Sequence, residues 1–386
     1  MLSKVFIVGG LRTPICKTGG GMKNILPEIA GSFILNGISE KYKIKPQNFD
    51  QVILGNAAGP GGNIARVTLL QAGWPESIPG ITVDFQCGSG LSSVNLAVSQ
   101  ILAGQEDLIL AGGIESTSLA PLRQFHKNDP RFNPELPFYS KAPFAPIDFA
   151  DPEMGVGAEN LANSLGISRE EMDAQALLSH RRAIRMKEEN ILEDIILPFI
   201  FDDKVISEDE SIRKNISEKL LARMPGAFIK GGNVTAGNSC LTHDGAAGVL
   251  LASERAIKKF NLKAEAVVID GTHIGVETSL FPLAPVAVIK KMLKRNNIKL
   301  EDIDAIEINE AFAVKVIACA RQLNLPPEKF NVLGGAIAYG HPYGASGCII
   351  LLHLLKTLEY TKGKIGIAAL GVGGGTGTGI MIERLS

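Results

Sequence analysis

The sequence has few cysteines, and it carries almost no net charge. Among 386 residues there are five cysteines and a formal charge of −1. The cysteines stand far apart, with no CxxC pair, which argues against a disulfide framework or a structural zinc. The neutral balance gives no reason to expect a nucleic acid or an anionic membrane surface as partner.

Long hydrophobic runs are also missing. No apolar stretch approaches the roughly 18 residues that a membrane-spanning helix needs, and the opening MLSKVFIVGG lacks the features of a signal peptide. We therefore expect a reduced, cytoplasmic protein with no membrane partner, no metal and no permanently bound cofactor.

Short β-branched runs that end in glycine alternate with longer stretches of helical spacing. This alternation predicts an α/β fold with a parallel or mixed sheet covered on both faces. The runs lie at 4–10, 50–55, 81–85 and 107–113, and again at 266–272, 304–313, 331–347 and 364–375.

The two series match in spacing. Cys87 lies 37 positions after Asp50, and His341 lies 37 positions after Asp304. We interpret this as two copies of one α/β unit, each ending a strand with a reactive residue just ahead of a helix. The alternative is that the equal spacing is a coincidence, because any two α/β segments can be aligned so that some positions match. Two copies predict a half at 1–118, completed by about 242–264, and a second half at 265–386.

The segment 119–241 differs in character. It opens with a proline-rich and aromatic-rich stretch and continues with two helical patterns, the second preceded by Ser168 and Glu171 in the spacing of a capping box. An insertion on a duplicated scaffold is where substrate contacts are expected, although a plain surface excursion also fits.

Cys87, in QCGSGL, is the first candidate for chemistry. A cysteine at a helix N-terminus faces unpaired N–H groups that favour its thiolate, but a free cysteine is more often buried and inert. His341, in YGHPYGASG, changes this balance because a nucleophilic thiol needs an imidazole within hydrogen-bond reach. The other five histidines lie in less distinctive contexts, and we treat them as structural.

Two further stretches lie at strand ends. Asn309 and Glu310, in NEAFA, stand where a strand gives way to a helix, a usual place for site residues in open α/β sheets; both are also ordinary helix-start residues. The glycine-rich GVGGGTGTG at 371–379 fits no nucleotide-binding motif. Its glycines let the backbone approach a ligand and offer N–H groups to an oxyanion.

Six motifs, in order along nearly the whole chain, resemble the thiolase family. They are QCGSGL, GGIES, MGVGAENLA, VTAGNSC with HDGAA, NEAFA, and GGAIAYGHPYGASG. The resemblance implies a five-layered αβαβα fold of two similar halves with a loop domain at 119–241, in homodimers or homotetramers. It also implies acyl transfer on coenzyme A thioesters, with coenzyme A and acyl-CoA as substrates.

The resemblance also assigns roles. Cys87 matches the acylated nucleophile, His341 the histidine that activates it, and Asn309 a residue that holds a water in one oxyanion hole. The N–H groups of Cys87 and Gly373 match the second hole. The expected substrate contacts are Arg213, Cys240, Met154 and Phe312, of which the match at Arg213, beside the coenzyme A adenine, is the weakest.

One departure bears on the reaction. Biosynthetic thiolases carry a second cysteine that moves the α-proton, and here the matching position is Gly371. Glu153 and Cys240 also differ from the pattern. Three interpretations stay open: a thiolase whose acid/base is Cys240, a water or His341; a non-condensing acyltransferase that uses the same acyl-cysteine; and a non-catalytic acyl-CoA-binding or scaffolding subunit. If the pocket is otherwise unchanged, Gly371→Cys should speed thiolysis.

Overall fold

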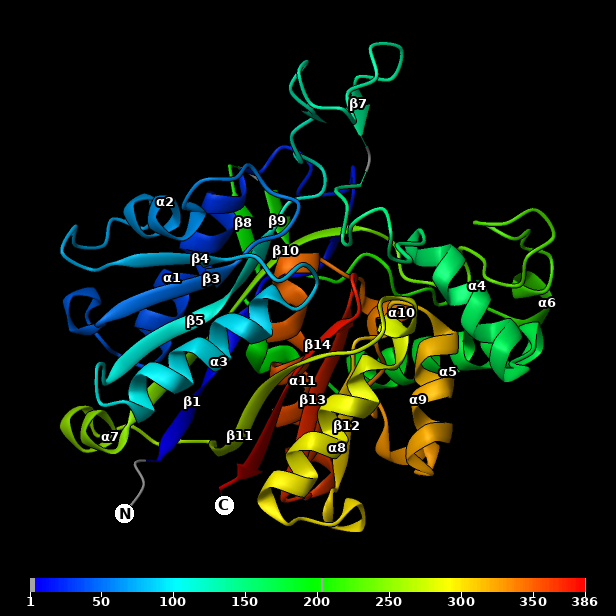
Figure 1. Cartoon of the computed structure of the whole chain (residues 1–386). Helices are drawn as coiled ribbons and strands as arrows, with labels where there is room; N and C mark the ends of the chain where they lie inside the picture. Colours follow the sequence, from blue (N-terminus) through cyan, green and yellow to red (C-terminus); the bar gives the residue numbers. More distant parts are fainter. Residues whose placement is uncertain (1–3, 140, 203, 386) are drawn as a thin grey trace.

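A mixed sheet forms the centre of the computed structural model, which describes residues 4–139, 141–202 and 204–385 (Figure 1). Its main strands are β1 (Val5–Arg12), β3 (Gln51–Gly55), β4 (Gly80–Val83), β5 (Leu108–Glu115), β10 (His243–Ser253), β11 (Ala266–Gly275), β12 (Ala305–Ile308), β13 (Ile365–Val372) and β14 (Thr376–Arg384). Their order is β12-β13-β14-β11-β1-β10-β5-β3-β4, and the short β2 (Cys16–Lys17) pairs with β10.

The sheet consists of two halves that pair in the same way. In each half a parallel pair, β3 with β5 or β12 with β13, is followed by two antiparallel neighbours. The halves join between β1 and β11 through two residue pairs only, Phe6 with Val267 and Ile7 with Ala266. The predicted duplication is therefore visible in the strand pairing.

Six helices complete the layers. They are α1 (Pro27–Lys41), α2 (Ile64–Gln71), α3 (Ser89–Leu102), α8 (Ala284–Asn296), α9 (Ala313–Leu323) and α11 (Tyr343–Thr361). The helices α1 and α2 cover the outer face of the first half, and α8 and α9 cover the outer face of the second. Between the two halves lie α3 and α11, which contact strands of both. This is the predicted five-layered αβαβα arrangement.

An aspartate stands at the start of an equivalent strand in each half, Asp50 before β3 and Asp304 before β12. Asp50 accepts hydrogen bonds from the N–H groups of Asp107 and Leu108, both at 2.8 Å. Asp304 does the same for Lys364 and Ile365, at 2.7 and 2.9 Å. Each carboxylate thus holds the start of the neighbouring parallel strand, which gives the matched spacing to Cys87 and to His341 a structural cause.

The segment after β5 leaves the sheet and returns at β10, which pairs directly with β5. It contains β6 (Arg123–Gln124), β7 (Phe138–Tyr139), α4 (Met154–Leu165), α5 (Arg169–Glu188), β8 (Phe199–Phe201), β9 (Lys204–Ile206) and α6 (Glu218–Leu221). Ser168 and Glu171 form the expected capping box of α5. The division into domains at 118 and 241 stays a prediction. The remaining helices are α7 (Glu254–Phe260) and α10 (Ala336–Tyr339).

An ion pair holds this segment to the sheet. The guanidinium of Arg12, on β1, donates to both carboxylate oxygens of Asp209 at 2.8 Å. Their side chains are 0% and 3% exposed, and Asp209 also accepts from the Ile15 N–H. Among the helices in the described ranges, none combines the length and the apolar character that crossing a membrane requires.

Breaking the Arg12–Asp209 pair should be costly. Asp209→Ala leaves a buried guanidinium without its partner, so we expect a loss of about 3–5 kcal/mol in unfolding free energy. The matched control is Glu208→Ala, which removes an exposed ion pair with Lys187 and should cost less than about 1 kcal/mol. Urea unfolding followed by the fluorescence of Trp74, the single tryptophan, measures both. Equal losses of unfolding free energy in the two variants would contradict the claim that the Arg12–Asp209 pair anchors this segment.

Candidate active site

The two central helices begin against each other. A Cβ added at Gly90, in the first turn of α3, would lie 2.6 Å from the carbonyl oxygen of Gly344, in the first turn of α11. A Cβ at Gly347 would lie 2.3 Å from the Leu91 nitrogen. Only glycine allows this approach, and it brings the turn that carries Cys87 close to the turn that carries His341.

Cys87 lies in a tight turn before α3. Ser89 Oγ accepts from the Phe85 N–H at 2.8 Å and donates to the Gln86 carbonyl at 2.6 Å, while Gln86 adopts a φ of 51°. Burial raises the pKa of the Cys87 thiol to about 11, although the nearby Lys315 charge opposes this rise. In the free protein burial therefore outweighs the helix N-terminus, contrary to the sequence-based expectation of a thiolate.

His341 is buried at 2% exposure, and its hydrogen bonds assign a tautomer. Ser346 Oγ donates to the Pro342 carbonyl at 3.1 Å, so its lone pair accepts the Nδ1–H of His341 at 2.5 Å. Nε2 is then unprotonated, and it accepts a hydrogen bond from the Asn309 side-chain amide at 3.3 Å. Burial, assisted by Lys315, lowers the pKa of His341 to about 3, so the ring is a neutral base.

Two supporting residues were missed by sequence reasoning. The His341 N–H donates to Nδ1 of His243 at 3.0 Å, a histidine that we had treated only as structural. Glu115, in the GGIES motif, accepts from the Gly344 N–H at 2.9 Å and from two N–H groups after β3. A buried carboxylate with such partners joins the first half to the turn after His341, and only its long-range contacts reveal that role.

Asn309 follows β12 and is 1% exposed. Its Oδ1 has no hydrogen-bond partner among the described residues. Asn309 and Ser346 also line a cavity of about 20 Å³, which exceeds the roughly 10–15 Å³ that one water requires. The site therefore has both the space and the unpaired acceptor for a bound water.

The end of β13 carries the glycines singled out in the sequence. Gly371 and Gly373 are both buried, and a Cβ at Gly373 would meet the ring of Phe144 at 2.3 Å. Neither the Gly373 N–H nor the Cys87 N–H donates a hydrogen bond to another residue in the part of the chain that the structure describes. A Cβ at Gly88 would lie 3.0 Å from Val372, so the Cys87 turn and this strand end are neighbours.

The expected substrate contacts fall into two groups. Met154, Cys240 and Phe312 belong to one hydrophobic cluster, and the Cys240 N–H donates to the Ala311 carbonyl at 2.9 Å. Burial, and then the Cys87 thiol, raise the pKa of Cys240 to about 12. The guanidinium of Arg213 donates to the Ala236 carbonyl at 3.2 Å, two residues after Val234 of the same cluster.

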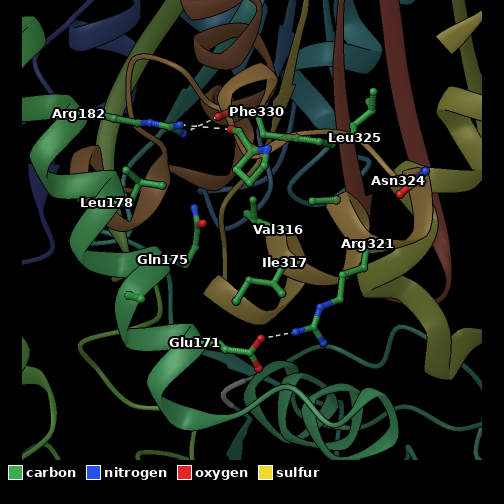
Figure 2. A pocket seen from close by; sticks show the side chains of 13 residues that line it. Glu171, Gln175, Leu178, Arg182, Val316, Ile317, Arg321, Asn324, Leu325 and Phe330 are labelled. Carbon is green, nitrogen blue, oxygen red and sulfur yellow. Dashed lines mark hydrogen bonds and ion pairs between the residues drawn. The ribbon is translucent and has the colours of Figure 1, made fainter. Parts of the chain in front are cut away.

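A larger cavity of about 530 Å³ lies between α5 and α9 (Figure 2). An ion pair between Glu171 and Arg321 crosses it, and Arg182 donates to the Phe330 carbonyl at 2.6 Å. The cavity contains none of the predicted catalytic residues. Gln175, which lines this cavity, donates to the Glu310 carboxylate at 2.9 Å. Glu310 follows Asn309 in the chain, so the cavity is connected to the candidate site by this hydrogen bond.

The raised pKa of Cys87 has a direct test. Because the thiolate is the reactive form, we expect alkylation of Cys87 by iodoacetamide in the free protein to speed up about tenfold per pH unit from 7 to 10. Mass spectrometry of the Cys87 peptide measures this rate. A rate that levels off near pH 7 would contradict the raised pKa.

Gly371 has no room for the cysteine that the sequence-based comparison suggested. A Cβ there would lie 2.3 Å from the backbone oxygen of Phe281 and 2.9 Å from Pro285. We expect Gly371→Cys to lower the unfolding free energy by about 1–3 kcal/mol and not to speed thiolysis. The control is Gly275→Cys, because nothing lies within 4 Å of a Cβ at Gly275. Faster thiolysis by Gly371→Cys would overturn this expectation.

The chain matches the models of a known protein family. Residues 5–255 match the family model "Thiolase, N-terminal domain", and residues 262–384 match "Thiolase, C-terminal domain". The chain is 40% identical over 386 residues to a putative acetyl-CoA C-acetyltransferase, VraB, of Staphylococcus aureus strain MRSA252, covering 99% of this chain and 100% of that protein. A probable acetyl-CoA acyltransferase of strain COL is 39% identical over 396 residues, with the same coverage.

Two solved structures are similar over the whole chain. The Bacillus anthracis acetyl-CoA acetyltransferase has a TM-score of 0.91 at 34% identity, covering 100% of this chain and 99% of that one. Human mitochondrial 3-ketoacyl-CoA thiolase in complex with CoA has a TM-score of 0.90 at 33% identity, with the same coverage. Together with the two matched domains, these similarities show that the chain belongs to the thiolase family.

Proposed function

We propose that this protein is a thiolase-type acyl-CoA C-acyltransferase that works through an acyl-Cys87 intermediate. Its substrates are coenzyme A thioesters, and its overall reaction is the condensation or thiolysis of 3-ketoacyl-CoA such as acetoacetyl-CoA. The observation that supports the proposal is the glycine contact between α3 and α11, because the turn with Cys87 precedes one of these helices and the turn with a neutral His341 precedes the other.

The first half of the reaction follows from the protonation states. Cys87 is a thiol at neutral pH, and Nε2 of the neutral His341 is unprotonated and accepts from the Asn309 amide. His341 takes the thiol proton as Sγ attacks the thioester carbonyl carbon, and it returns that proton to the departing coenzyme A. Ser346 holds the imidazole in the required tautomer.

Two groups of donors suit the developing negative charge. The N–H groups of Cys87 and Gly373 lack other acceptors in the described chain, which is what an oxyanion hole requires. On the other side we assign His341, with Asn309 and its water, to a second hole. Cys240, Met154, Phe312 and Arg213 are assigned to the binding of the acyl-CoA.

A second candidate function follows from Gly371. Condensation needs a group that removes an α-proton, and such a group typically contributes about 10² to 10⁴-fold in rate. With no side chain at 371, the same acyl-Cys87 is also suited to pass its acyl group to a thiol, which needs no α-proton removal. The family resemblance adds a homodimer or homotetramer to the proposal, and the cysteine usage adds a cytoplasmic location.

The acyl intermediate is directly observable. Incubation with acetyl-CoA should add one acetyl mass to the peptide that contains Cys87, and Cys87→Ala should abolish this adduct because it removes the proposed nucleophile. Peptide mass spectrometry makes the measurement. An adduct on Cys240 instead of Cys87 would show that Cys240 is the nucleophile. The absence of any adduct on the native protein would favour a non-catalytic acyl-CoA-binding subunit.

A further inference from the structure

Lys315 carries a buried amine that the reaction as described does not use. It lies in the first turn of α9, two residues after the NEAFA motif, and is 2% exposed. Lysine is rarely buried without a charged partner, and no carboxylate in the described part of the chain lies within ion-pair distance of it. Burying an amine without a charged partner lowers the stability of the fold, so its presence calls for an explanation.

The amine of Lys315 reaches the position that lacks a side chain. Its Nζ donates to the carbonyl oxygen of Gly371 at 3.1 Å. Gly373, with its unpaired N–H, follows two residues later, and Val372 packs against the Gly88 turn. The amine thus lies at the backbone of this strand end, and Cys87 and Cys240 are near enough to influence its pKa.

We propose that Lys315 is the acid/base that moves the α-proton, in place of the absent residue at 371. This inference rests on the proposed function and names the group that its second half requires.

The protons and electrons balance in condensation. The Lys315 amine takes a proton from Cα of the second acyl-CoA, and the electron pair of that C–H bond forms the new bond to the acyl carbonyl carbon of acyl-Cys87. The carbonyl–sulfur bond breaks and its electrons leave on Sγ. Lys315, now an ammonium, returns the proton to Sγ, which restores the thiol and the amine. Thiolysis runs the same steps in reverse.

The charges around Lys315 suit this role. Burial lowers the pKa of its side chain, which favours the neutral amine. The neighbouring titratable groups that oppose this shift are the thiols of Cys319, Cys87 and Cys240. Because the ammonium is opposite in sign to the Cys87 thiolate, proton removal and thiolate departure support each other.

The alternatives named from the sequence fit less well. Cys240 would have to form a second thiolate beside Cys87, and the Cys87 charge raises its pKa further. His341 already serves Cys87, and its Nδ1 is held by Ser346. Lys315, unlike Cys240, gains a positive charge when it takes a proton, and unlike His341 it has no other role in the proposed reaction.

The test separates proton removal from acylation. Native protein and variants are incubated with acetyl-CoA in D₂O; proton NMR follows deuterium exchange at the acetyl group, and mass spectrometry follows the Cys87 adduct. Lys315→Met should lose about 10² to 10⁴-fold in exchange and in thiolysis of acetoacetyl-CoA, while the adduct still forms. Lys315→Arg keeps a donor at this position but stays protonated near neutral pH and cannot take up a proton, so it should not restore exchange.

The matched control is Lys291→Met. Lys291, on the neighbouring α8, also donates to a strand carbonyl, that of His273 at 2.8 Å, but it is exposed. Its loss should leave exchange unchanged. If Lys315→Met does not fold by Trp74 fluorescence, Lys315→Gln takes its place, since it keeps a donor for Gly371 but no transferable proton.

Each outcome decides one claim. Exchange at the native rate in Lys315→Met, or exchange restored by Lys315→Arg, would overturn the role of Lys315 and leave the acyl-cysteine intact. A native protein that forms the adduct but exchanges no deuterium would do the same. The absence of any adduct on the native protein would overturn the proposed function itself, and the role of Lys315 with it.

Discussion

The site depends on one steric constraint, the absence of side chains where α3 and α11 begin. Gly90 and Gly347 let two buried helices from different halves of the chain meet at backbone distance. The Cys87 turn and the His341 turn, which precede these two helices, therefore lie close to each other. A methyl group at either glycine would collide with the backbone of the opposite helix, so the chemistry and the packing rest on the same contact.

The duplicated architecture explains why such a contact exists. Each half places a strand, a turn and a central helix in the same order, with Asp50 or Asp304 holding the neighbouring strand. The halves share only two residue pairs in the sheet. Their central helices therefore carry much of the packing between them, and the two ends that meet hold one reactive residue each.

Burial sets the protonation states within this site. It keeps Cys87 as a thiol and His341 as a neutral ring, and it disfavours a charge on Lys315. Burial opposes the charged form of each group, and a neighbour of opposite charge stabilises that form. Proton transfer between close partners is the natural chemistry of such a cavity.

Local patterns of glycine, β-branched and polar residues predict the strand and helix alternation, the doubled unit, and the motifs that carry Cys87, Asn309 and His341. Long-range packing reverses the pKa expected for Cys87, closes the space at Gly371 with Phe281, and holds the His341 turn through Ser346, His243 and Glu115. It also brought Lys315 to Gly371, 56 positions further along the chain. These facts depend on contacts between distant segments, and no local pattern encodes which buried groups will share a cavity.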